Sequence, residues 1–189
     1  MKFSELLSFK EDVFFNGAVQ VDWFYDKEKS SLVAENFMFH GKEYHGAEGS
    51  PDAKLKDTVQ FVYEIAEKLD NNQKSNFLNL AIASYGTGKS HLAVTLAEIL
   101  SGSDYKPATY KKIIENIERL GEDSKYKAGI IKQYTQRPNL VLVLNGMRDF
   151  NLNYELLSVA QKSLTLYGCS TEKLKKINRS LEVAGMFFE

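Results

Sequence analysis

A short run with two glycines in the middle of the chain, Ala83-Ser84-Tyr85-Gly86-Thr87-Gly88-Lys89-Ser90, constrains its fold more than any other feature. Gly86 and Gly88 can adopt backbone angles that are closed to residues with side chains, so successive amide N–H groups can turn to one side and form a concave anion site. A helix that begins near Lys89 would point its N-terminal N–H groups, and the positive end of its dipole, at the same anion. The run therefore predicts a loop that cradles a phosphate group.

The polar residues of the run predict the other contacts with a nucleotide. The Lys89 ammonium can reach the β- and γ-phosphate oxygens and is the residue expected to act in catalysis, while the Ser90 hydroxyl is placed to ligate Mg²⁺. ATP and Mg²⁺ are therefore the expected ligands. The residues expected to contact the nucleotide are Ser84, Tyr85, Gly86, Thr87, Gly88, Lys89, Ser90 and His91. The competing interpretation is a glycine turn followed by an ordinary surface lysine.

The segments around the loop match the order strand, turn, helix that such a loop requires. Residues 77–83 form a short apolar run that predicts a buried strand, and residues 91–100 carry apolar side chains at helical spacing. Residues 139–144 form a second, fully apolar run, of the kind found at the centre of a parallel sheet. We therefore predict an α/β fold with a partial parallel sheet of the P-loop NTPase type, flanked by helices. Ala83 replaces the first glycine of the strict motif, and a small residue is expected to be tolerated there.

The first part of the chain is rich in aromatic residues and predicts a separate arm. Partly alternating apolar residues in 13–25 and 32–39 predict two strands joined by a charged turn at 26–29. A β-rich arm is thus expected over residues 1–48, followed by a nucleotide-binding domain over residues 49–189. Helices of that domain are predicted at 51–69, 107–120, 123–135, 154–166 and 171–183.

One part of a hydrolysing site has no counterpart in the sequence. The run 139–144 ends in Asn145, where P-loop enzymes ordinarily carry an acidic residue that holds the Mg²⁺ shell. Asn145 can hydrogen-bond a phosphate or a metal-bound water, but it cannot act as a general base. Arg148 and Asp149 lie within loop reach of a phosphate, although an ordinary strand-to-helix turn is the favoured interpretation. Because the acidic strand is missing and the chain stops in an apolar segment, we expect an N-terminal piece of a longer ATPase, truncated on its C-terminal side.

Composition and the remaining reactive residues exclude several classes of function. The chain is 43% hydrophobic with a net charge of -1, which favours one globular core and disfavours a dedicated basic nucleic-acid module. A single cysteine, Cys169, cannot form an internal disulfide, and no leader or membrane-length apolar run is visible, so we expect a cytoplasmic protein without membrane contact.

The histidines His40, His45 and His91 lack the spacing of a metal set. Tyr44 or His45 is a candidate for stacking on the adenine.

The motifs also resemble a known family. Tyr-Gly-Thr-Gly-Lys-Ser-His-Leu at 85–92, followed by Val-Leu-Val-Leu-Asn-Gly at 141–146, is similar to the AAA-type ATPases of large bacterial DNA-defence proteins. These include ATPases of bacteriophage-exclusion systems and of phosphorothioation-dependent restriction systems. The resemblance implies a long multidomain protein, ATP-driven conformational change, protein partners in a defence complex, and action on DNA through the full-length protein. It assigns the phosphate and metal roles to Lys89 and Ser90, while the family's acidic strand and arginine finger have no counterpart here.

These observations predict the ATP-binding N-terminal part of a larger ATPase of a DNA-restriction or anti-phage system, which couples ATP binding and hydrolysis to action on a partner or on DNA. Taken alone, this chain is expected to bind ATP more than it hydrolyses it. Two alternatives stay open: a nucleotide-sensing interaction module without hydrolysis, which would use the aromatic arm for docking, and a small-molecule kinase. The kinase is disfavoured because an arginine-bearing lid would draw on only four arginines, Arg119, Arg137, Arg148 and Arg179.

Overall fold

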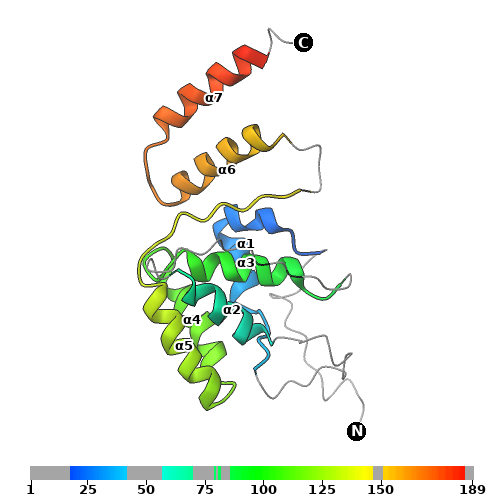
Figure 1. Cartoon of the computed structure of the whole chain (residues 1–189), viewed down its shortest axis with the longest axis vertical. Helices are drawn as coiled ribbons and strands as arrows, with labels where there is room; N and C mark the ends of the chain where they lie inside the picture. The colour runs from blue at the N-terminus through cyan, green and yellow to red at the C-terminus, as the bar shows by residue number, and fades with distance from the viewer. Residues whose placement is uncertain are drawn as a thin grey trace.

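A computed structural model describes residues 18–41, 57–69, 79, 81, 86–146 and 151–185, except the side chains of residues 178 and 181–185. This part of the chain contains a short 3-10 helix, η3 (Val21–Tyr25), and a series of α-helices (Figure 1). These are α1 (Lys27–Glu35), α2 (Thr58–Glu67), α3 (Lys89–Leu100), α4 (Pro107–Glu118), α5 (Glu122–Tyr134), α6 (Leu152–Leu166) and α7 (Glu172–Gly185).

The helices up to α5 form the body of the molecule. Helix α3 packs mainly against α1 and η3, α2 packs against α5, and α4 lies against α5 and α1. Helix α6 contacts η3, and α7 contacts α6, so these two helices extend the molecule away from the body (Figure 1).

One cluster of buried apolar side chains joins α1 to α5. Each valine or isoleucine in it contributes about 1.5–3 kcal/mol when it is fully buried, and each alanine contributes less. The fully buried members of this core are Ala34 from α1, Val59, Val62 and Ala66 from α2, Ile99 from α3, Ile113 and Ile117 from α4, and Ala128 and Ile131 from α5. The core therefore draws together helices on both sides of the glycine loop, and α3 contributes Ile99, near its C-terminal end.

The predicted α/β fold with a parallel sheet is wrong. The residues described here are all-helical or irregular, and none of them belongs to a strand. Of the predicted strand 77–83, only Asn79 and Ala81 are described, and both are irregular.

The second predicted strand is an extended segment over residues 139–145, which crosses between α6 and the body (Figure 1). Side-chain hydroxyls take the place of a neighbouring strand along one edge of it. The Tyr25 hydroxyl donates to the Val143 carbonyl (3.0 Å) and accepts from its N–H (2.8 Å). The Ser163 hydroxyl donates to the carbonyl of Val141 at 2.6 Å. An apolar run that predicts a central strand is thus stabilised here without a sheet.

The predicted β-rich arm is also wrong where it is described. Residues 21–25 and 27–35 are the helices η3 and α1, while residues 1–17 lie outside the described part. The charged stretch that suggested a turn is a helix start: the Asp26 carboxylate accepts hydrogen bonds from the N–H groups of Glu28 (3.2 Å) and Lys29 (3.1 Å). Aspartate at this position satisfies N–H groups that lack a partner in the first helical turn.

The helices predicted after the loop are confirmed within a few residues. Pro107 occupies the first turn of α4, where its fixed φ angle suits a helix and its missing N–H costs nothing. Gly121 has a φ of 117° and separates α4 from α5. Helix α2 is confirmed from Thr58 onward, with Asp57 as its cap (2.6 Å to the Gln60 N–H), while the predicted start at residues 51–56 is outside the described part. In the described part of the chain, no helix has the length and apolar character needed to cross a membrane.

We predict that Asp26→Ala lowers the free energy of unfolding by about 1 kcal/mol, because it removes the N-cap of α1. Asp26→Asn keeps a capping oxygen and should lose less, which makes it the matched control. Hydrogen bonds from the Lys29 backbone and side chain lower the pKa of the Asp26 carboxyl. The charged cap therefore stabilises the fold above about pH 4, and this contribution is lost as the pH falls through the folded-state pKa. Urea denaturation at pH 7 and at pH 3 measures both effects; equal stability of Asp26→Ala and the parent chain would contradict the capping role.

Candidate nucleotide-binding site

The described part of the glycine loop leads directly into α3. Gly86 has a φ of 79° and Gly88 has a φ of 80°. Both values fall in the left-handed region that glycine adopts at low cost. A Cβ atom added to either glycine would meet no atom of the described chain within 4 Å. The glycines are therefore required for the backbone path and not for close packing against the described part of the chain, which leaves open space beside both.

The helix that follows the loop begins directly after the second glycine. Gly88 is the N-cap residue of α3, and Lys89 and Ser90 are the first two residues of the helix. The N–H groups of a first helical turn point along the axis, out of the helix end. Lys89 is exposed and Ser90 is half-buried, so both side chains can be approached from solvent. The structure thus places residues 86–90 as one turn and helix start, in the order that the sequence predicts.

Other predicted site residues are only partly described. Ser84 and Tyr85 of the loop lie outside the described residues, as do the candidates Arg148 and Asp149. The candidates for adenine stacking, Tyr44 and His45, are likewise outside. Asn145 is described, and it is half-buried at the end of the extended segment.

The side chain of His91 contacts α1. Its Nε2–H donates to the Val33 carbonyl over 2.6 Å, and its ring meets the Phe37 ring edge-on, with centroids 5.0 Å apart. Burial lowers the pKa of His91, while the hydrogen bond to Val33 opposes that shift. The imidazole is therefore neutral at pH 7. Sequence reasoning places His91 among the nucleotide contacts; its side chain here ties the first turn of α3 to the body.

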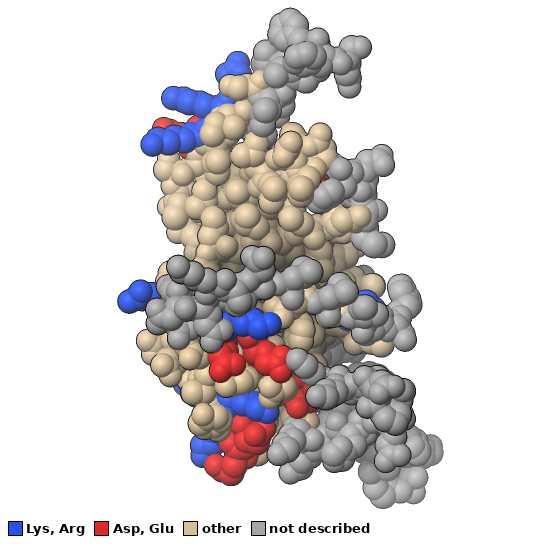
Figure 2. Space-filling model, viewed as in Figure 1, with Lys and Arg blue, Asp and Glu red and all other residues tan. Residues whose placement is uncertain are grey.

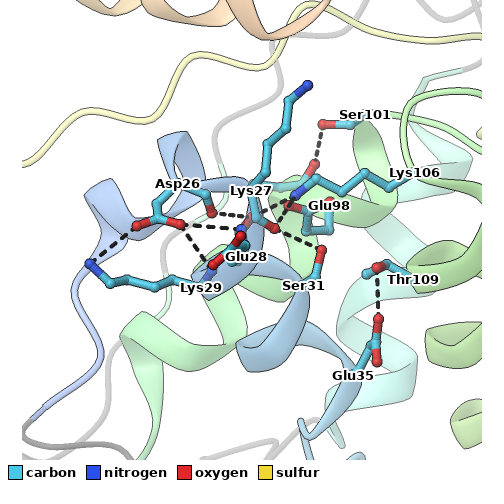
Figure 3. A network of polar contacts seen from close by, with 12 residues as sticks. Asp26, Lys27, Glu28, Lys29, Ser31, Glu35, Glu98, Ser101, Lys106 and Thr109 are labelled. Atoms are coloured by element: carbon cyan, nitrogen blue, oxygen red, sulfur yellow. Dashed lines mark hydrogen bonds and ion pairs between the residues drawn. The ribbon is translucent and has the colours of Figure 1, made fainter.

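A buried ion pair fixes α3 at its other end (Figure 3). The Lys106 ammonium lies 2.6 Å from the Glu98 carboxylate, and these side chains are 13% and 2% exposed. The same ammonium donates to the Ser30 hydroxyl (2.6 Å) and the Lys27 carbonyl (3.3 Å) of α1. This network joins α1 and α3 to the residue before α4. Sequence reasoning missed it; the signal was a glutamate, Glu98, inside the apolar pattern of residues 91–100.

A second polar contact joins α4 to the end of α1. The Thr109 hydroxyl donates to the Glu35 carboxylate at 2.7 Å, and the Asn116 amide donates to the Glu35 carbonyl at 2.9 Å. Helix α1 is therefore held on two sides, by α3 and by α4. Because α3 is bound to α1 in this way, the helix that follows the loop has a fixed position.

The residues at the loop fit ATP with Mg²⁺. The described part of the loop is open where a Cβ of Gly86 or Gly88 would lie, as close approach of a phosphate would require. Among the described residues, no group of three or more His, Cys, Asp or Glu side chains is placed to hold a metal. Mg²⁺ commonly keeps several waters and binds through one protein oxygen and the substrate phosphates. A single ligand from the described chain, the Ser90 hydroxyl, is compatible with that mode.

Comparison with known proteins adds no relative. No model of a known protein family, no curated protein and no solved structure matches the chain.

We predict that Lys106→Met lowers the free energy of unfolding by about 3–5 kcal/mol, because it leaves the Glu98 carboxylate buried without its partner. The double variant Glu98→Gln/Lys106→Met removes both charges and should recover most of that loss. Lys111→Met, at an exposed lysine of α4, is the matched control and should change stability little. Urea denaturation of the four chains provides the measurement. If Lys106→Met alone were as stable as the double variant, the ion pair would not be what holds the helices together.

Proposed function

We propose that this chain binds ATP with Mg²⁺ through the loop of residues 83–90 and the start of α3. One observation carries the proposal: Gly86 and Gly88 both adopt left-handed backbone angles immediately before α3, with open space where side chains would lie. A surface turn needs no such pair of conformations next to Lys89 and Ser90. A phosphate cradle does, because its amide groups must converge on one anion.

The proposed roles follow from the chemistry of each group. Loop amides and the N-terminus of α3 bind the β-phosphate, and the Lys89 ammonium binds the β- and γ-oxygens. The Ser90 hydroxyl would hold Mg²⁺, which neutralises charge on the phosphates. The side chain of His91 orients the first turn of α3 from the α1 side through the Val33 carbonyl.

The biological role is proposed on the family resemblance alone. By that resemblance, the chain is the ATP-binding part of a larger cytoplasmic ATPase of a DNA-restriction or anti-phage system, acting with protein partners and on DNA. Asn145 stands where such enzymes carry an acid, so we expect this chain to bind ATP more readily than it hydrolyses it. A nucleotide-sensing module without hydrolysis remains the alternative. Phosphate release from a longer natural chain separates the two.

We predict that the parent chain binds ATP in the presence of Mg²⁺ and that Lys89→Ala weakens this binding about 10–100-fold, the loss expected for one charged hydrogen-bonding partner of a phosphate. Ser90→Ala should retain ATP binding but lose most of its dependence on Mg²⁺. Lys111→Ala, which removes an exposed lysine of α4, is the control and should bind like the parent. Isothermal titration calorimetry with and without Mg²⁺ provides the measurement. Equal affinity of Lys89→Ala and the parent would refute the proposed site.

A further inference from the structure

Among the described residues, the extended segment makes hydrogen bonds along one edge and none along the other. In an extended chain, the N–H and C=O of one residue point to the same edge, and those of the next residue point to the opposite edge. The carbonyls of the odd-numbered residues each accept a hydrogen bond from a hydroxyl group. The pairs are Asn139 with Tyr167 (2.9 Å), Val141 with Ser163 (2.6 Å) and Val143 with Tyr25 (3.0 Å). We call this side the hydroxyl edge.

The even-numbered residues form the other side, which we call the open edge. Within the described part of the chain, no hydrogen bond uses the backbone groups of Leu140, Leu142 or Leu144. The side chains of Leu140 and Leu142 are exposed, at 51% and 37%. A row of unpaired N–H and C=O groups flanked by apolar side chains is a template for pairing with another strand.

The devices that ordinarily protect such an edge are absent from this segment. Native proteins place charges, prolines or bulges on exposed edges to prevent pairing. Residues 139–146 contain no charged residue and no proline. Figure 2 shows charged side chains of both signs over the lower part of the molecule, where α4 and α5 lie, and mostly basic ones near α7, whereas the described surface between them is largely uncharged in this view. The segment itself therefore brings no charge to a second copy that approaches the open edge.

The sequence of the segment suits pairing with a second copy of itself. Asn-Leu-Val-Leu-Val-Leu-Asn at 139–145 reads the same in both directions. An antiparallel pair centred on Leu142 therefore brings residues of the same type face to face, so that apolar side chains meet apolar side chains along the pair. In that register Leu142 faces its own copy and Leu140 faces Leu144, and each facing pair exchanges two N–H···O=C hydrogen bonds through the open edge. The odd-numbered backbone groups stay on the hydroxyl edge, so no existing bond must break.

We propose that the chain self-associates through antiparallel pairing of residues 139–145 along the open edge with a second copy of itself. The interface is a short ribbon of low area, so the dimer is weak, with half-association at roughly 10–100 μM. The inference does not depend on nucleotide binding, because the paired residues belong to a different segment from the glycine loop.

Charge substitution at the two-fold axis tests the proposal. Leu142→Lys and Leu142→Glu each place like charges opposite one another, and each should weaken self-association at least about tenfold. An equimolar mixture of the two variants places opposite charges there and should restore dimers. Leu120→Lys is the matched control, since Leu120 is 37% exposed as well, and it should associate like the parent. Sedimentation equilibrium from 5 to about 300 μM provides the measurement, and circular dichroism reports whether each variant is folded.

Dimerisation of the parent and the control, loss in both single variants and recovery in the mixture would establish the pairing. A parent chain that is monomeric across this range would overturn the proposal. Dimers that persist in both single variants, or a mixture that stays monomeric while both variants remain folded, would overturn it as well.

Discussion

The ion pair between Glu98 and Lys106 is the interaction on which the arrangement of the body most depends. Removing two charges from water costs several kcal/mol per ion, and this cost is offset only when geometry and additional hydrogen bonds are good. Here the Lys106 ammonium also donates to the Ser30 hydroxyl and the Lys27 carbonyl. Helices α1 and α3 cannot slide or rotate past each other without taking these two hydrogen bonds away from the buried Lys106 ammonium. Since α3 begins at Lys89, this constraint also fixes the position in the molecule at which the glycine loop ends.

Both ends of α3 are thus tied to α1. The His91 imidazole donates to the Val33 carbonyl near the loop, and Lys106 bridges from Glu98 to α1 at the far end. An anion that binds at the N-terminus of α3 therefore meets a helix that is already oriented, and little ordering cost remains for the helix itself. Only the exposed loop would then have to change its conformation when the anion binds.

The sequence predicted the second half of the chain better than the first, for local reasons. Helices α4 to α7 carry apolar stripes and recognisable boundaries such as Pro107 and Gly121, and these signals need no information from distant residues. The N-terminal arm was mispredicted because alternating aromatic residues suggested strands while the capping role of Asp26 was overlooked. The glycine loop was predicted from its own residues, and its described half has the expected backbone conformation. The sheet was mispredicted because an apolar run such as 139–144 has no local mark that distinguishes a paired strand from a segment bound by hydroxyls. Tyr25, whose hydroxyl binds Val143, is 118 residues away in sequence.

The central claim is that ATP binds at residues 83–90, and hydrogen exchange measured by mass spectrometry tests it most directly. Amides of peptides covering residues 83–92 should exchange more slowly when saturating ATP and Mg²⁺ are added, because phosphate oxygens accept hydrogen bonds from them. Peptides from α6 should exchange at the same rate with and without the nucleotide. Unchanged exchange at the loop, or protection confined to another region of the chain, would contradict the account.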